Sequence, residues 1–157
     1  MQNHLDCYQK VKKKCFNFIT SQETKKEKFK NKEKMIKSFL IPICFWINKN
    51  KPQNKTFIIG LAGGQGTGKT TISSLIRLIL TTYFKLNVFK VSIDDFYRTR
   101  KERIKLSKSK HPLLLTRGVP GTHDVDMINT LFYNVKKKKF NSMLIPKFDK
   151  SCLLYTS

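Results

Sequence analysis

The chain has 157 residues, enough for one domain with its own hydrophobic core. It carries 32 Lys and Arg against 10 Asp and Glu, a net charge of +22, which by itself suggests a nucleic acid or an anionic membrane as partner. Only five of these cations are arginine, so the planar guanidinium that recognises bases and phosphates is scarce. The abundance of Lys, Asn, Ile and Phe favours a compositional bias over nucleic-acid binding.

The four cysteines show no CxxC pair and no spacing typical of metal ligands, which predicts reduced thiols in a cytosol-like compartment. No secretory signal is visible near the N-terminus. Residues 39–47 are apolar, but Pro42 interrupts them and they are far shorter than the ~20 residues that cross a membrane. We therefore expect a soluble, cytoplasmic protein with no membrane partner.

Residues 1–50 form a polar, lysine-rich leader whose last part becomes apolar at rough helical spacing, with a break at Pro42. We expect this last part to be a helix that docks on the domain. Residues 48–55 are typical of a linker and contain the helix breaker Pro52.

The next segments alternate between two periodicities. Residues 56–62 are a short apolar run, typical of a buried strand. From Ile72 to Leu80 the apolar residues recur at the 3.6-residue period of an amphipathic helix. Residues 87–93 alternate apolar and polar side chains, which predicts a second strand. Residues 98–111 are strongly charged, and we expect a mobile connection there.

The last part of the chain adds one helix and one strand. Residues 124–139 are expected to be helical, with Asp124 and Asp126 in the first turn and lysines in the last, both favourable for the helix dipole. Residues 142–146 are a third candidate strand. The order strand, helix, strand, helix, strand predicts an α/β domain with a parallel sheet flanked by helices. Three strands make an incomplete sheet of this kind.

The sequence GGQGTGKT, residues 63–70, matches the pattern G-x-x-x-x-G-K-[ST] between the first strand and the first amphipathic helix. In such a P-loop, successive N–H groups point at phosphate oxygens, and the start of the helix adds partial positive charge. We expect Lys69 to bridge the β- and γ-phosphates of a nucleoside triphosphate and the Thr70 hydroxyl to bind Mg²⁺. A glycine-rich turn without a ligand is the alternative. The residues expected to contact the nucleotide are Gly63, Gly64, Gln65, Gly66, Thr67, Gly68, Lys69, Thr70 and Thr71.

Two acids, Asp94 and Asp95, follow the second strand, at the edge where open α/β sheets bind ligands. A kinase needs one carboxylate to orient the acceptor hydroxyl and take its proton, and another to hold Mg²⁺. Spacing alone does not divide these roles between the two residues. The pair could instead cap a helix or form a turn after the strand.

The stretches GLAGGQGTGKTT, VSIDDFYRTR, HPLLLTRGVPGTHD and IPKFDKS, in this order, resemble the ATP-dependent D-glycerate 3-kinase family, from about Ser38 to Ser151. The P-loop followed by DDFY also resembles the wider group of uridine kinase, phosphoribulokinase and pantothenate kinase. The resemblance implies a P-loop NTPase fold of the kinase type, with ATP and Mg²⁺ as cofactors. It implies phosphoryl transfer to a small hydroxy acid, with D-glycerate as the best match. It also implies Lys69 and Asp94 as catalytic residues, with Asp95 as the reserve base and a metal ligand.

The loop RGVPGTHD, residues 117–124, distinguishes this family from other P-loop kinases, and the resemblance implies that it holds the acceptor. Arg117 offers a bidentate guanidinium for a carboxylate. A Pro-Gly turn followed by a helix cap is the purely structural alternative. Tyr97 and Arg98 border the acceptor side as weaker candidates. The other residues expected to bind the acceptor are Thr122, His123, Asp124 and Asp149, the last matching an acid of the family in PKFDKS.

The chain departs from the family after residue 151. The family continues with further strands, a pocket for the nucleotide base and a lid with arginines, whereas residues 152–157 do not resemble that continuation. We expect residues 51–151 to be the N-terminal part of a kinase domain and residues 152–157 to be a non-native tail. We also expect this polypeptide to be poorly folded or weakly active alone.

Two other functions stay open. A uridine- or pantothenate-type kinase would differ only in its acceptor. A basic P-loop protein that binds nucleic acid without catalysis would lose affinity steeply with salt. The sequence does not decide between ATP and GTP, the oligomeric state, or a plastid instead of the cytoplasm.

Overall fold

The computed structural model describes residues 2–137, so the third expected strand, Asp149 and the tail lie outside the described residues. The chain divides into two compact units, residues 1–90 and residues 91–157. The first unit carries the P-loop, and the second carries the DDFY and RGVPGTHD motifs.

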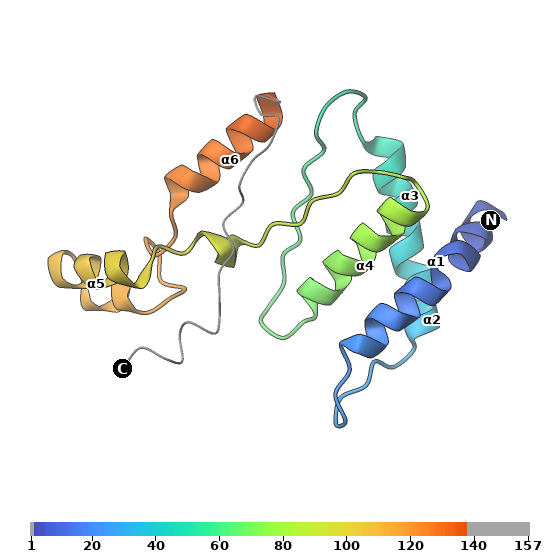
Figure 1. Ribbon diagram of the computed structural model, residues 1–157, viewed down its shortest axis with the longest axis horizontal. Helices are drawn as coiled ribbons and strands as arrows, with labels where there is room; N and C mark the ends of the chain where they lie inside the picture. Colours follow the sequence, from blue (N-terminus) through green and yellow to red (C-terminus); the bar gives the residue numbers. More distant parts are fainter. Residues whose placement is uncertain (1, 138–157) are drawn as a thin grey trace. The chain divides into compact units, whose positions relative to one another are not determined.

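The first unit is built from four α-helices and one π-helical turn (Figure 1). The helices are α1 (Gln2–Ser21), α2 (Lys32–Met35), α3 (Ile41–Asn50) and α4 (Lys69–Thr82), and the π-helical turn is η1 (Ile36–Leu40). Helices α1, α3 and α4 pack against one another. The core they share consists of Cys7, Tyr8, Val11, Cys15, Ile19, Ile36, Leu40, Ile41, Cys44, Ile47, Leu75, Ile79 and Leu80.

Helix α4 confirms the helix expected from the apolar period between residues 72 and 80. Helix α1 was not expected, although its buried residues Cys7, Val11, Cys15 and Ile19 are spaced four apart. The four lysines of the helix, at positions 10, 12, 13 and 14, hid this spacing, because they lower the mean hydropathy of the segment without disturbing its buried face. The leader therefore supplies ten of the thirteen residues of this core, and α4 supplies the other three.

The expected helix break at Pro42 is wrong, because the helical backbone runs through this residue. Pro42 stands in the first turn of α3, directly after the π-helical turn η1. A proline has no N–H to donate to the preceding turn, and the wider π-helical turn η1 lies where this hydrogen bond is missing.

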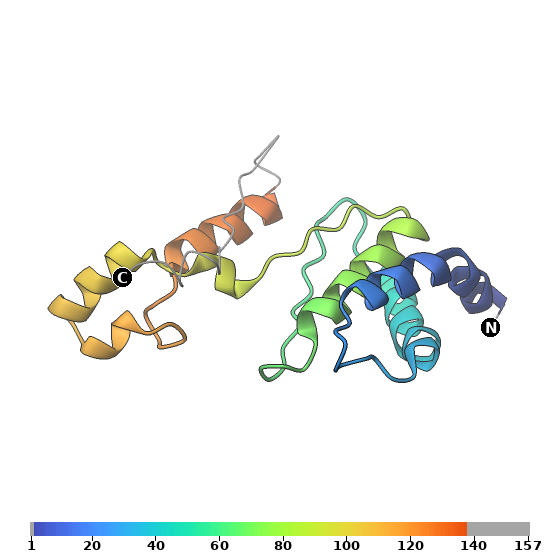
Figure 2. The ribbon, with the colours of Figure 1, turned by 60° about the horizontal axis from the view of Figure 1, so that its bottom comes forward.

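The expected strands at residues 56–62 and 87–93 are not formed. Across residues 2–137 the structure contains no β-strand, and its β-pairing is limited to one isolated antiparallel bridge between Tyr97 and His123. Figure 2 shows both segments as extended loops, one before and one after α4. Their apolar side chains are exposed, with Ile59 50% and Phe89 74% accessible. An apolar run becomes a strand only when a neighbour completes its hydrogen bonds, and the described residues supply none.

The described part of the second unit, residues 91–137, contains two α-helices and two short 3₁₀ turns. They are η2 (Ile93–Phe96), α5 (Arg100–Ser109), η3 (Pro112–Leu115) and α6 (Val125–Lys137). Helix α5 packs on η3, and α6 contacts η2. Helix α6 confirms the helix expected after residue 124.

Helix α5 replaces the mobile connection that the charged sequence suggested. The Thr99 hydroxyl accepts a hydrogen bond from the backbone N–H of Glu102, and the Glu102 carboxylate accepts one from the backbone N–H of Thr99 at 2.8 Å. This reciprocal pair satisfies two of the free N–H groups at the helix start. The T-x-x-E spacing was visible in the sequence. Within the described part of the chain, no helix has the length and apolar character needed to cross a membrane.

Three thiols lie in the core of the first unit. Cys7, Cys15 and Cys44 are fully buried, and burial raises the pKa of Cys7 to about 11 and those of Cys15 and Cys44 to about 12. Because only the thiolate is nucleophilic, we expect iodoacetamide at pH 8 to alkylate them slowly in the native protein and fully in urea. Mass spectrometry of the peptides measures the difference. Native Cys15 reacting as fast as in urea would contradict this.

The same pKa shifts link stability to pH. The folded state holds these thiol protons more tightly than the unfolded chain, whose ordinary thiol pKa is 9.0. The stabilisation is therefore fully present below about pH 9 and is lost as the pH rises towards the folded pKa values.

Candidate functional site

The glycine loop forms a turn that ends where α4 begins. Gly66 and Gly68 have φ angles of 78° and 77°, in the left-handed region that glycine enters without steric cost. Gly68 is also the N-cap of α4. The sequence pattern therefore has the local backbone it needs, with glycines at the two positions where a side chain would strain the turn.

Lys69, the first residue of α4, folds back over this loop. Its Nζ donates hydrogen bonds to the carbonyl oxygens of Gly63 at 2.7 Å and Gly64 at 2.6 Å. The Thr67 hydroxyl also donates to the Gly64 carbonyl, at 2.8 Å. The two carbonyls thus hold the Lys69 ammonium at the start of the helix. Phosphate oxygens bind such a cation more strongly than neutral carbonyls do, so a nucleotide tail can take over these contacts.

Thr70 follows in the first turn of α4 and is exposed. When Mg²⁺ binds with a nucleotide, one or two protein ligands are enough, because phosphates and water supply the rest. A hydroxyl next to Lys69 fits this requirement. Among residues 2–137 no three or more His, Cys, Asp or Glu side chains are grouped to hold a metal ion by themselves.

In the second unit, the DDFY and RGVPGTHD motifs lie side by side although they are far apart in the sequence. The β-bridge pairs Tyr97 with His123, and the two rings stack with centroids 4.1 Å apart. On either side of the bridge, the backbone N–H of Arg98 donates to the Thr122 carbonyl at 2.9 Å, and that of Asp124 donates to the Phe96 carbonyl at 2.8 Å. The backbone thus fixes one motif against the other.

The two acids of DDFY have different surroundings. One carboxylate oxygen of Asp95 accepts a hydrogen bond from the Ser92 N–H at 3.1 Å, while the Ser92 hydroxyl accepts one from the Asp94 N–H at 3.3 Å. Asp95 therefore helps to cap η2, which is the structural role that the sequence left open for this pair. The half-buried carboxylate of Asp94 takes no part in the cap.

Two of the expected acceptor residues have internal partners. The side chain of Thr122 is fully buried, and its hydroxyl donates to the Val119 carbonyl at 2.6 Å. The Asp124 carboxylate accepts a hydrogen bond from the Met127 N–H at 3.0 Å and so caps α6. These contacts shape the loop, together with Gly118 and Gly121 at φ 88° and 93°.

Arg117 and His123 both lie beside the Tyr97 ring. Arg117 is exposed, and its guanidinium carbon lies 5.8 Å from the centre of the Tyr97 ring. The Nε2 atom of His123 is buried, and no hydrogen-bond partner for it lies among the described residues. A buried ring nitrogen without a partner costs free energy unless a ligand or water completes it. Tyr97, which contacts both side chains, is more central than the sequence indicated.

Arg103 is a residue that the sequence did not single out. It is a charged side chain only 5% exposed, inside the stretch expected to be a mobile connection. The one signal was its type, since arginine is rare in this lysine-rich chain.

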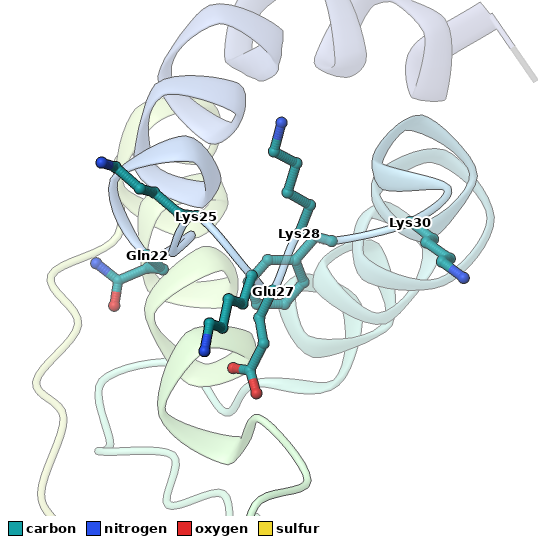
Figure 3. Close-up of a pocket in the computed structure, with 7 residues that line it drawn as sticks. Gln22, Lys25, Glu27, Lys28 and Lys30 are labelled. Atoms are coloured by element: carbon teal, nitrogen blue, oxygen red, sulfur yellow. The ribbon is translucent and has the colours of Figure 1, made fainter.

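A pocket of about 600 Å³ lies elsewhere, on the loop between α1 and α2 (Figure 3). Lys25, Lys28 and Lys30 diverge from one another there, which is ordinary for a solvated charged loop. The pocket contains none of the residues expected to bind nucleotide or acceptor. It is lined by Gln22, Lys25, Lys26, Glu27, Lys28, Phe29 and Lys30.

In comparison with known proteins, this chain is similar in sequence to proteins named as kinases. No family model matches it, and no solved structure matches it either. It is 40% identical over 103 residues to a protein named uncharacterized kinase mug58 from Schizosaccharomyces pombe, covering 64% of this chain and 37% of that protein. It is 36% identical over 101 residues to the probable ATP-dependent kinase TDA10 from Saccharomyces cerevisiae, covering 59% and 35%.

A more distant similarity concerns the putative uridine kinase C227.14 from Schizosaccharomyces pombe, 29% identical over 93 residues, which are 59% of this chain and 39% of that protein. The chain spans little more than a third of the length of these relatives. Their shared description as kinases supports a P-loop kinase as the kind of protein to which this chain is similar.

Proposed function

We propose that the chain is part of an ATP-dependent P-loop kinase that transfers the γ-phosphoryl group to a hydroxyl of a small hydroxy acid, with D-glycerate as the acceptor. The observation that carries the proposal is the Lys69 ammonium held over the glycine turn at the start of α4. The relatives named as kinases, one of them as ATP-dependent, support the same activity.

The proposed fold is the parallel sheet of a P-loop NTPase. Residues 56–62 and 87–93 are its candidate strands, since both are extended, apolar and placed directly before the P-loop and before η2. Their exposed apolar side chains are those that a sheet covered on both faces would bury.

At the nucleotide end, the amides of residues 63–68 would surround the phosphates and Lys69 would contact the β- and γ-phosphoryl oxygens. Thr70 would hold Mg²⁺, with Asp95 as a further ligand. The metal would neutralise charge on the phosphate oxygens as the transferred group leaves ADP.

At the acceptor end, Arg117 would bind the carboxylate of the acid through two parallel hydrogen bonds. The free Nε2 of His123 would hydrogen-bond one of its hydroxyl groups. Asp94 would take the proton of the attacking hydroxyl as its oxygen bonds to the γ-phosphorus. Thr122 and Asp124 would hold the loop in shape, and Asp149 would add a contact to the acceptor.

The acceptor can be identified by ADP release measured with D-glycerate, uridine and pantothenate in parallel. We expect glycerate to give the highest turnover. Uridine is the second candidate, because a relative is named as a putative uridine kinase. Turnover with uridine alone would overturn the acid as acceptor and leave the kinase intact. Salt-sensitive binding of nucleic acid with no ADP release from any acceptor would favour the non-enzymatic reading.

Arg117→Ala tests the carboxylate contact. A hydrogen bond to a charged group contributes about 1.5–3 kcal/mol, so we expect the KM for glycerate to rise roughly 10- to 100-fold, with little change in the KM for ATP. Arg77→Ala, at an exposed arginine of α4, is the matched control. An unchanged KM for glycerate in Arg117→Ala would remove glycerate as the acceptor at this loop.

A further inference from the structure

Arg103 is a buried cation in the second unit whose hydrogen bonds go to main-chain carbonyls. Its Nε donates to the Arg98 carbonyl at 3.2 Å, and its Nη1 donates to the Leu115 carbonyl at 2.5 Å. The side chain is 5% exposed. Burying a charge costs desolvation free energy unless its hydrogen-bond partners are well placed. A guanidinium at this position is therefore destabilising unless the two carbonyls compensate for its lost hydration.

Electrostatics add to the cost. Burial lowers the pKa of Arg103, and the neighbouring cations Arg117 and Arg100 lower it further, while Tyr97 acts in the opposite direction. No carboxylate is among these influences on Arg103. A methionine or leucine of similar size would avoid this penalty, so packing alone does not explain a guanidinium here.

The two carbonyls that Arg103 holds flank the acceptor motifs. Arg98 directly follows Tyr97, and its N–H bonds to the RGVPGTHD loop at Thr122. Leu115 lies two residues before Arg117 and ends η3, which packs on α5. The planar Arg103 guanidinium therefore makes hydrogen bonds to two segments at once, the one that carries Tyr97 and the one that leads to Arg117.

We propose that Arg103 is a positioning residue that sets the Arg117 guanidinium over the Tyr97 ring and so prepares the loop for an anionic acceptor. The placement of Arg117 is argued from the geometry alone. The effect of Arg103 on catalysis rests in addition on the function proposed above. Lysine cannot replace it, because a single ammonium has no planar fork to reach both carbonyls in fixed directions.

The first experiment needs no ligand. In the 157-residue chain, nuclear Overhauser contacts between the Arg117 side chain and the Tyr97 ring are compared in the wild type, Arg103→Lys, Arg103→Met and the control Arg100→Ala. We expect the contacts in the wild type and in Arg100→Ala, weakened contacts in Arg103→Lys, and none in Arg103→Met. Circular dichroism checks that each variant is folded.

The second experiment measures KM and kcat with D-glycerate and ATP for the same four proteins. A positioning role predicts a KM for glycerate at least 10-fold higher in Arg103→Lys, with the KM for ATP within twofold of the wild type. A merely structural role would instead lower kcat in proportion to the unfolded fraction and leave both KM values unchanged.

The outcomes separate the two proposals. Contacts that persist in a folded Arg103→Met protein overturn the positioning role, and so does complete unfolding of both Arg103 variants, since Arg103 would then be a determinant of folding. Contacts that depend on Arg103 in a protein that does not phosphorylate glycerate support the positioning role and overturn the acceptor.

Discussion

Lys69→Ala is expected to lower phosphoryl transfer about 10²- to 10³-fold, the loss typical of removing one preorganised group that stabilises transition-state charge. In the structure the Lys69 ammonium is fixed by the Gly63 and Gly64 carbonyls at the start of α4. Alanine leaves the turn and the helix but removes the cation that would meet the β- and γ-phosphates. Nucleotide affinity should fall as well, because the cation contacts the bound state and the transition state alike.

The measurement is ADP release together with calorimetric titration of ATP. Lys90→Ala is the matched control, since Lys90 is an exposed lysine whose Nζ makes a hydrogen bond away from the glycine turn, to the Ser74 hydroxyl on α4. It should leave both values within twofold of the wild type. Equal turnover of Lys69→Ala and Lys90→Ala would show that the glycine turn does not bind the transferred phosphate.

Leu75→Ala is expected to lower the free energy of unfolding by about 2–5 kcal/mol, the range for deleting a buried leucine. Leu75 is fully buried on α4, in the core shared with α1 and α3. Helix packing leaves little room for the neighbours to close the cavity. The loss is a large part of the roughly 5–15 kcal/mol by which domains are stable.

Urea unfolding followed by circular dichroism measures the change. Arg77→Ala, on the same helix but exposed, should alter stability by no more than about 0.5 kcal/mol. If Leu75→Ala unfolded at the same urea concentration as Arg77→Ala, the packing of α4 against the leader would be wrong.

Elements with a strong local signal could be predicted from the sequence. Helix α4 has a clean apolar period, and the turn before it has glycine at the two positions with positive φ. Helix α5 had the capping pair Thr99 and Glu102, but its charged residues concealed it. Helix α1 was missed for a similar reason. In a lysine-rich sequence, the spacing of apolar residues and the capping residues therefore predict helices better than the mean hydropathy of a segment does.

Features that depend on distant partners could not be predicted in the same way. The apolar runs around Ile59 and Phe89 predicted strands. Strand pairing, however, depends on neighbouring segments, and an apolar pattern does not specify which segment pairs with it. In the site, Thr122 and Asp95 were expected to face ligands. Each also makes a hydrogen bond with a backbone group, which the sequence does not specify for Thr122. The burial of Arg103 depends in part on the Leu115 carbonyl, twelve residues away.

The shared core of the first unit also links the leader to the glycine turn, so that a change in the leader affects that turn. Most of the leader lies before the kinase resemblance, which begins near Ser38, yet its apolar residues cover Leu75 and Ile79 on the helix that starts at Lys69. A proteolytic cut or a splice event that removed residues 1–50 would uncover that helix and loosen the turn in front of it. Substitutions in residues 1–50 that disturb this core would then be measured as weakened ATP binding.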